Sequence, residues 1–294
     1  MRVALTGASG HVGRFVAAEL LAGGHEVVAW RRPSRAAGAL DGAVGWVPGG
    51  LDDPSSFTPL LAGADALVHA AFAHVPGRYR GGEGDDVAGF LRTNLQGSLA
   101  LIACARAIGV GRVVFLSSRA VYGERLAGRP LDEDHPLRPT THYGAYKAAV
   151  ELTLRGYGKA EGWAVCSLRA TGVFGVAEPV ERSKWAELVR TCAAGRVPTP
   201  RGGTEVWGPD VARAVHLLLT APAAAVVGEA FNASDVYVTH RAVSRLLGGP
   251  LAPASGGPTG LMATGKLQAL GWRPAGWRAV EATVAELGAA LGGR

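Results

Sequence analysis

Residues 2–13 read RVALTGASGHVG, a short apolar run followed by a glycine-rich turn, and this stretch decides the fold. The run predicts a buried strand, and residues 12–24 then place apolar side chains at helical spacing. Glycines between a strand and a helix let the backbone approach a pyrophosphate, while the helix N-terminus offers free N–H groups and partial positive charge. The stretch predicts a dinucleotide-binding turn formed by Gly7, Ser9, Gly10, His11, Val12 and Gly13.

The same alternation of strand and helix continues along the first half of the chain. Apolar runs typical of strands lie at 25–30, 44–49, 65–72, 112–118 and 163–170, and helical patterns lie at 89–109 and 143–161. Such an order favours a parallel sheet covered by helices on both faces. We expect an α/β fold with a doubly wound parallel sheet of the Rossmann type.

The rhythm weakens after about residue 172. Helical patterns at 183–195 and 210–221 and one more strand pattern at 228–234 follow at irregular intervals. We expect residues 1–172 to form the dinucleotide-binding domain, with segments around 205–235 returning to it. Residues 173–204 and 236–294 are expected to form a smaller, discontinuous C-terminal lobe that binds the substrate.

Composition excludes several classes of function. No segment reaches the roughly 18 uninterrupted apolar residues of a membrane span, and the N-terminus lacks the pattern of a signal peptide. The three cysteines are far apart, which fits a reducing compartment and predicts no metal site. The net charge of +6 is scattered, with no basic run longer than Arg31–Arg32. We expect a cytoplasmic protein that binds neither nucleic acid nor membrane.

The end of the second predicted strand bears on the cofactor. Dinucleotide folds that bind NAD(H) usually carry an acidic residue there, which holds the ribose hydroxyls. Here the strand continues into Arg31 and Arg32. A carboxylate would repel a 2′-phosphate, whereas a guanidinium binds it in a fork. The sequence therefore favours NADP(H), with NAD(H) as the alternative if these arginines only face water.

A tyrosine and a lysine stand four residues apart at 143 and 147, so both side chains share one helix face. Tyrosine titrates near 10 in water, so a tyrosine base near pH 7 needs a shift of about 3 units. An ammonium about 5 Å away supplies roughly 3 kcal/mol at an effective dielectric near 20. Ser118, at the end of an earlier strand, offers a hydroxyl at the same edge of the sheet. Ser118, Tyr143 and Lys147 are therefore the candidate catalytic residues.

These motifs together resemble the extended short-chain dehydrogenase/reductase family, the NAD(P)-dependent epimerase/dehydratase type. The matching stretches are TGASGHVG (6–13), DALVHAAF (65–72), RTNLQGSLALIACARAIGVGRVVFLSS (92–118), PLDEDHPLRPTTHYGAYKAAVE (130–151), LRATGVFG (168–175), GPDVARAV (208–215) and LGWRP (270–274). The resemblance therefore covers nearly the whole chain.

The resemblance implies roles at the matching positions. Tyr143 is the general acid/base, Lys147 its electrostatic partner and ribose anchor, and Ser118 orients the reacting oxygen. Residues expected around the cofactor are Leu51 near the adenine, Ala70 and Ala71 along the dinucleotide, and Asn94 as a structural support. Relatives often dimerise through the helices expected at 89–109 and 143–161, so a homodimer is expected.

The chain also departs from the family pattern. Gly50 stands where many relatives have Asp, and Arg31 replaces the ribose-binding acid of NAD users. Arg119 and Ala120 follow Ser118 where sugar dehydratases typically carry Asp-Glu. Elimination of water then lacks its usual proton donor and base, which argues against a dehydratase.

The substrate end is less determined. Phe72, Ser118, Arg78 and Arg201 are candidate substrate contacts, although for both arginines a solvated loop residue is the favoured alternative. Three functions follow. The first is an oxidoreductase that moves hydride between nicotinamide and a secondary alcohol or ketone of a sugar or related small molecule. The second is a nucleotide-sugar epimerase with tightly bound NAD. The third is a non-catalytic, dinucleotide-sensing regulatory protein.

Overall fold

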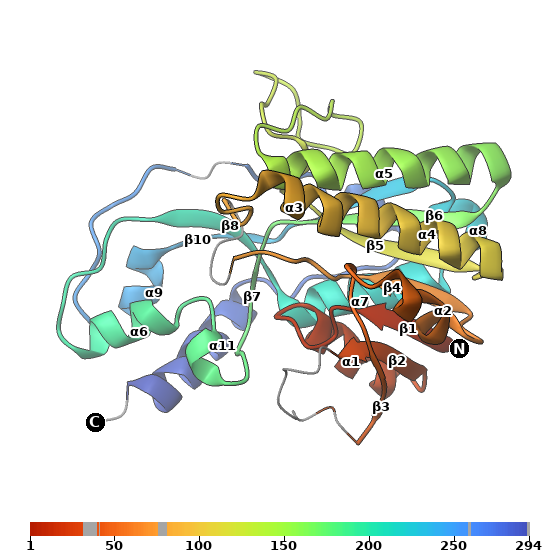
Figure 1. Cartoon of the computed structure of the whole chain (residues 1–294). Coiled ribbons are helices and arrows are strands. Elements are labelled where there is room, and N and C mark those ends of the chain that lie inside the picture. Colours follow the sequence, from red (N-terminus) through yellow and green to blue (C-terminus); the bar gives the residue numbers. More distant parts are fainter. Residues whose placement is uncertain (32–39, 41, 76–80, 258–259, 293–294) are drawn as a thin grey trace.

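A parallel sheet forms the centre of the computed structural model, which describes residues 1–31, 40, 42–75, 81–257 and 260–292. Within these residues its strands lie in the order β3-β2-β1-β4-β5-β6-β9, and all neighbouring pairs run parallel (Figure 1). Their bounds are β1 Arg2–Thr6, β2 Glu26–Arg31, β3 Val44–Pro48, β4 Ala66–His69, β5 Arg112–Ser118, β6 Ala164–Ala170 and β9 Glu229–Ala233. The doubly wound α/β fold predicted from the sequence is confirmed.

Strand order places the functional edge. From β1 the chain builds outward through β2 and β3 on one side, and through β4, β5 and β6 on the other. In such sheets ligands bind at the carboxyl ends of the strands, where the order reverses. That point lies here between β1 and β4, directly after Thr6 and His69.

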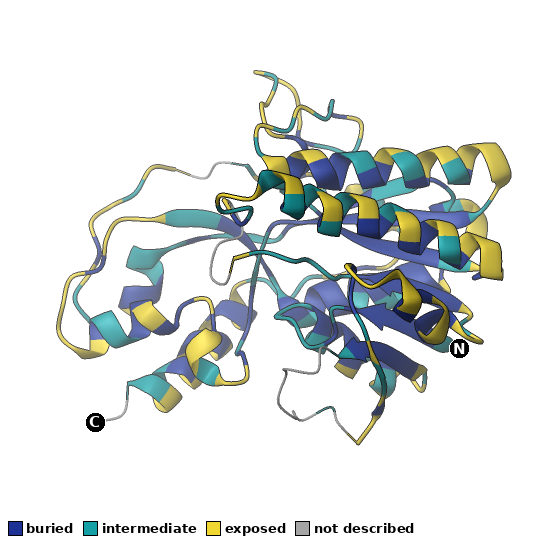
Figure 2. Cartoon of the chain, viewed as in Figure 1, coloured by how far each residue is buried: buried dark blue, intermediate teal, exposed yellow. Residues whose placement is uncertain are grey.

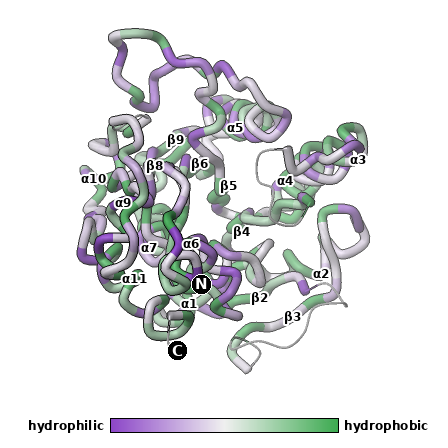
Figure 3. The backbone as a smooth tube through the Cα atoms, turned by 90° about the vertical axis from the view of Figure 1, so that its left-hand side faces the viewer, coloured by the Kyte–Doolittle hydropathy of each residue, from purple (hydrophilic) through white to green (hydrophobic). Residues whose placement is uncertain are grey.

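Helices cover both faces of the sheet because each strand alternates its apolar side chains between them. Helices α1 (Gly13–Ala22) and α7 (Gly208–Thr220) pack against one face, and α2 (Phe57–Leu61), α4 (Gly97–Ile108) and α5 (His142–Glu161) against the other. Figure 3 shows α4 and α7 on opposite sides of β4 and β5. The strands between them are almost entirely buried (Figure 2).

A second, smaller sheet has the order β10-β8-β7, formed by β7 (Gly172–Phe174), β8 (Gly202–Trp207) and β10 (Val236–Thr239). Helices α6 (Ala186–Ala193), α9 (His240–Leu246) and α11 (Trp277–Leu291) share its apolar core. Short α-helices complete the chain at α3 (Val87–Leu91), α8 (Ala223–Val226) and α10 (Gly265–Ala269). Strand β8 lies in the small sheet, while α7 and β9 lie with the main one, and the domain boundaries drawn from the sequence stay a prediction.

No helix in the described part of the chain is long and apolar enough to cross a bilayer.

Candidate active site

The glycine turn packs directly on the end of β4. Gly7 has φ +75°, and a Cβ added there would lie 2.7 Å from the carbonyl oxygen of Ala70. The Gly10 N–H donates to the Gly7 carbonyl at 2.8 Å, and a Cβ on Gly13 would overlap that same carbonyl. Val12 caps α1, which begins at Gly13. The first N–H groups of this helix therefore face the strand edge where a pyrophosphate would bind.

Two other residues of the turn are Ser9 and His11, and the backbone of Val173 on β7 lies near the His11 ring. Ser9 is half-buried. The His11 ring packs edge-on against Phe15, with centroids 5.7 Å apart. Burial, and then the neighbouring Arg14, lower the pKa of His11 to about 4, so its imidazole is neutral near pH 7. The guanidinium of Arg14 donates to the carbonyl of Val176, just after β7.

At the end of β2, the Arg31 guanidinium lies over the indole ring of Trp46 on β3, 5.3 Å from its centroid. This cation–π contact holds a positive charge where NAD-binding folds usually place an acid. Arg32 lies outside the described residues. Leu51, expected near the adenine, is buried three residues after β3, and its carbonyl leaves no room for a side chain at Gly97.

Beyond β4 the chain is held by two polar side chains. The Thr6 hydroxyl accepts from the N–H groups of Ala70 and Ala71 at 3.1 and 3.0 Å. The Asn94 amide pairs with both backbone groups of Ala73, accepting from its N–H and donating to its carbonyl at 2.8 Å each. The amide of Asn94 also donates to the Phe90 carbonyl at 3.0 Å. The contacts of Asn94 are therefore those of a residue that supports segment 70–73.

Tyr143 and Lys147 lie on α5, which packs against β5, the strand that ends at Ser118. The Thr141 hydroxyl caps α5 by accepting from the Gly144 N–H at 3.0 Å, so the helix begins one residue before Tyr143. The Lys147 ammonium lies 5.9 Å from the Tyr143 ring centroid and donates to the Leu116 carbonyl at 2.6 Å. Leu116 lies two residues before Ser118 on the same strand.

Gly144 brings the end of β5 close to α5. A Cβ on Gly144 would overlap the carbonyl of Ala120, in the 3-10 turn Arg119–Val121 that directly follows Ser118. Ser118 itself begins this turn, where its hydroxyl accepts from the Ala120 N–H at 3.2 Å. The close packing of turn on helix therefore sets the distance from Ser118 to the first turn of α5.

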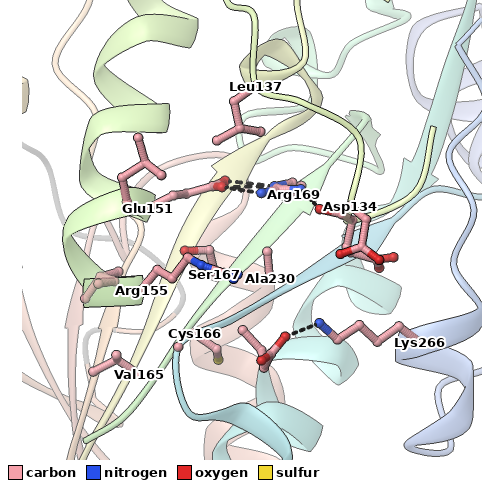
Figure 4. Close-up of a pocket in the computed structure, with 15 residues that line it drawn as sticks. Asp134, Leu137, Glu151, Arg155, Val165, Cys166, Ser167, Arg169, Ala230 and Lys266 are labelled. Carbon is pink, nitrogen blue, oxygen red and sulfur yellow. Dashed lines mark hydrogen bonds and ion pairs between the residues drawn. The ribbon is translucent and has the colours of Figure 1, made fainter. Parts of the chain in front are cut away.

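Burial makes Lys147 unusually acidic. Its side chain is only 3% exposed, and this desolvation lowers its pKa to about 7, against the opposing effect of Glu151 one helical turn later. Glu151 is itself held by Arg169 on β6 at 2.7 Å, and Figure 4 shows the two side chains facing each other. Beside this pair, between α5, β6 and β9, lies a cavity of about 50 Å³. It lies away from the β1–β4 edge.

The candidate substrate residues are placed differently from one another. The Phe72 ring packs against that of Tyr143, with centroids 4.9 Å apart, so it lies beside the candidate acid/base. Arg201 is exposed, and its carbonyl accepts from the N–H of His240 at 2.8 Å. Arg78 lies outside the described residues.

The two residues directly after Ser118 are Arg119 and Ala120, and not the Asp-Glu pair typical of sugar dehydratases. The Arg119 guanidinium donates to the Gly260 carbonyl at 3.0 Å, which ties this turn to the loop after α9. No group of three or more metal-ligating side chains occurs in the described segments.

Sequence reasoning missed the buried polar residues behind the turn, Thr6, His69 and Ser98. They form one hydrogen-bonded chain: His69 contacts the Thr6 hydroxyl at 2.7 Å and the Ser98 hydroxyl at 2.8 Å. A signal was present, because a histidine inside the otherwise apolar run DALVHAAF must find polar partners when it is buried.

Known proteins resemble the chain over most of its length. The model of the NAD dependent epimerase/dehydratase family matches residues 3–234. The UDP-glucose 4-epimerase of Corynebacterium glutamicum is 29% identical over 93% of this chain and 91% of that protein. A 4-hydroxy-2-methyl-3-oxo-4-farnesyl-3,4-dihydroquinoline-1-oxide ketoreductase of Stigmatella aurantiaca is 34% identical over 65% of this chain and 56% of that one.

Solved structures agree with this fold. The crystal structure of the Thermus thermophilus UDP-glucose 4-epimerase in complex with NAD superposes with a TM-score of 0.79 and 25% identity, covering 98% of this chain and 99% of that one. With the family match over residues 3–234, this confirms the resemblance inferred from the motifs. The chain belongs to the NAD dependent epimerase/dehydratase family, within the extended short-chain dehydrogenases/reductases.

Proposed function

We propose that this chain is an NAD(P)-dependent oxidoreductase, acting on a secondary alcohol or ketone of a sugar or related small molecule. The observation that carries the proposal is the buried Lys147, whose ammonium lies beside Tyr143 and is fixed on β5 two residues before Ser118. A protonated Lys147 next to a phenol favours the phenolate, which is the form needed to take a proton from an alcohol. The phenolate in turn favours the protonated lysine, against the burial that lowers the Lys147 pKa to about 7.

Tyr143, Ser118 and Lys147 have different tasks in the proposed reaction. The nicotinamide, when bound, accepts or supplies the hydride. In the oxidation direction, Tyr143 takes the proton of the substrate hydroxyl, and in reduction it returns a proton to the carbonyl oxygen. Ser118 donates a hydrogen bond to that oxygen and holds it in place. Lys147 stabilises the phenolate and offers N–H donors to the ribose hydroxyls.

We propose NADP(H) as the preferred cofactor, with NAD(H) as the alternative. Arg31, held over Trp46, supports this preference because it offers a guanidinium to a 2′-phosphate. The solved Thermus thermophilus relative is a complex with NAD, so the two cofactors have to be compared on this chain itself. Catalytic efficiency with NADPH should exceed that with NADH, and Arg31→Asp should move the preference toward NADH. A preference for NADH in the wild-type protein would overturn the assignment.

The relatives favour two different outcomes of one chemistry. An epimerase uses the hydride step twice and keeps its cofactor, and the Corynebacterium glutamicum relative bears that name. A reductase exchanges its cofactor, and the Stigmatella aurantiaca relative is named a ketoreductase. Arg119 and Ala120 speak against elimination of water, although the family also takes in dehydratases. A regulatory protein that only senses the dinucleotide would need neither Tyr143 nor Lys147.

One experiment separates these functions. The purified protein is first analysed for bound dinucleotide, then tested with ketones, aldehydes, uronic acids and UDP- or dTDP-sugars at the absorbance of reduced nicotinamide. Net redox change with exchange of free cofactor supports the oxidoreductase. Retained cofactor with isomerised product and no net redox identifies an epimerase. Binding without turnover, unaffected by Tyr143→Phe, identifies a sensor.

The homodimer expected through α4 and α5 also stays a proposal. Ile108 at the end of α4 and Leu152 on α5 are large apolar side chains that lie 43% and 59% exposed. Sedimentation analysis should give a dimer mass, and Leu152→Glu should shift it to monomer.

A further inference from the structure

A continuous chain of buried hydrogen bonds runs behind the proposed dinucleotide site. It begins at Thr6, the last residue of β1, passes through His69, the last residue of β4, and ends at Ser98 on α4. The Ser98 hydroxyl donates to the Asn94 carbonyl in the π-helical turn Arg92–Gln96. The side chains of Thr6, His69, Ser98 and Asn94 are all fully buried, so water cannot substitute for any of these hydrogen bonds.

Counting protons fixes the direction of every bond. The Thr6 hydroxyl oxygen accepts from the N–H groups of Ala70 and Ala71, which fills its two acceptor positions, and the Ala70 N–H is shared with the Thr6 carbonyl at 3.3 Å. Its single hydrogen must therefore go to Nδ1 of His69, at 2.7 Å, and Nδ1 carries no proton. The proton of His69 is then on Nε2 and is donated to Ser98 at 2.8 Å, while the Ser98 hydrogen goes to the carbonyl of Asn94.

Both ends of this chain of hydrogen bonds lead to the segment that follows β4. At one end Thr6 holds the amides of Ala70 and Ala71, and at the other the side chain of Asn94 holds both backbone groups of Ala73. Segment 70–73 is thus fixed at both ends. It carries Phe72, whose ring packs on Tyr143, and its first carbonyl lies against Gly7.

We propose that His69 is a positioning residue, which acts as a neutral Nε2–H imidazole to hold segment 70–73 between the glycine turn and Tyr143. This inference rests on the dinucleotide site of the proposed function. Burial, and then the charge of Lys147, lower the pKa of His69 to about 3, so the required neutral form persists at physiological pH. A ring that only filled space could be replaced by phenylalanine without effect on the site.

The test combines a reading on the wild-type protein with two variants and one control. Imidazole ¹⁵N shifts of wild-type His69 should report the Nε2–H tautomer between pH 5 and 9. His69→Phe removes both ring contacts, and Ser98→Ala leaves Nε2–H without an acceptor. The matched control is Ser244→Ala, because Ser244 is equally buried and donates to the His240 carbonyl at 2.8 Å, one turn back on α9.

In both variants, hydrogen exchange at the amides of Ala70, Ala71 and Ala73 should quicken at least tenfold, and the dissociation constant for NADPH should rise at least tenfold. Ser244→Ala should leave both unchanged. An Nδ1–H tautomer, or unaltered exchange in both variants, would overturn the role of His69. If the wild-type protein binds neither NADPH nor NADH, the proposed function fails, whereas exchange and tautomer still decide whether His69 positions this segment. Should His69→Phe not fold, Ser98→Ala and the wild-type tautomer suffice.

Discussion

The ammonium of Lys147 on α5 donates to the carbonyl oxygen of Leu116 at 2.6 Å, and so ties this helix to the carboxyl end of β5. This bond joins the helix that carries Tyr143 to the strand that carries Ser118. It also buries the ammonium of Lys147 beside the half-buried ring of Tyr143, in a place where the ammonium cannot be hydrated freely.

Replacing Lys147 by Met removes that charge and keeps the length of the side chain. Alcohol oxidation should slow, and the rising limb of its pH–rate profile should move to higher pH, because the phenolate of Tyr143 loses its partner. The check is initial rate against pH with saturating cofactor. Lys159→Met is the control, since Lys159 pairs with Glu229 at a partly exposed site away from Tyr143. An unmoved limb in Lys147→Met would remove the electrostatic role.

Glu151→Gln should be strongly destabilising. It leaves the buried Arg169 without its carboxylate, and breaking such a pair costs about 3–5 kcal/mol. The variant should also lower the pKa of Lys147 further, because Glu151 is the group that raises it. Urea unfolding measures the first effect, and Glu161→Gln is the control, since its partner Arg106 is exposed and little change is expected. Equal unfolding curves for the two variants would contradict this account.

Two glycines of α5 make a matched pair of substitutions. At Gly144 a Cβ would overlap the Ala120 carbonyl, so Gly144→Ala should push the turn after Ser118 away and lower both activity and stability. At Gly156 a Cβ meets nothing within 4 Å, so Gly156→Ala should stabilise the helix by about 0.5–1 kcal/mol with activity unchanged. The melting temperature and the turnover rate of both variants test these two expectations. Similar behaviour of the two variants would show that the contact at Ala120 does not matter.

Acid should destabilise the fold through the buried His69 and the partly buried His11. The pKa of His69 is lowered to about 3 and that of His11 to about 4, so the folded chain stays neutral where the unfolded chain binds protons. Their contribution is complete above pH 6.5 and is lost as the pH falls through the folded values, at up to about 1.4 kcal/mol per pH unit for each group. Urea unfolding between pH 7 and 4 should show this slope, reduced in His69→Phe. A flat profile would mean that His69 and His11 titrate normally.

How well each strand could be predicted from the sequence depends on the length of its hydrophobic pattern. Continuous apolar runs predicted the strands of the main sheet, because a parallel strand buried on both faces is apolar along its whole length. Strand β4 ended earlier than the run 65–72 suggested, since Ala70 and Ala71 turn their amides to Thr6. The short strand β7 and the glycine-led β8 escaped notice because neither leaves enough of a period-two pattern.

The candidate site was predictable where chemistry lies in one residue type at one spacing, as for Tyr143 and Lys147. It was not predictable where chemistry comes from segments that meet only in the fold. The contact of Trp46 with Arg31 and that of His69 with Thr6 depend on which strands are neighbours. The contact of His69 with Ser98 depends on how α4 packs on the sheet.

The most direct test of the central claim, that Tyr143 is the acid/base beside a bound nicotinamide, is Tyr143→Phe. NADPH binding by fluorescence titration and single-turnover hydride transfer are measured on the same preparation. The account predicts a dissociation constant within a few-fold of wild type and hydride transfer slowed by about 10²–10⁴-fold. Hydride transfer at the wild-type rate in Tyr143→Phe would contradict it.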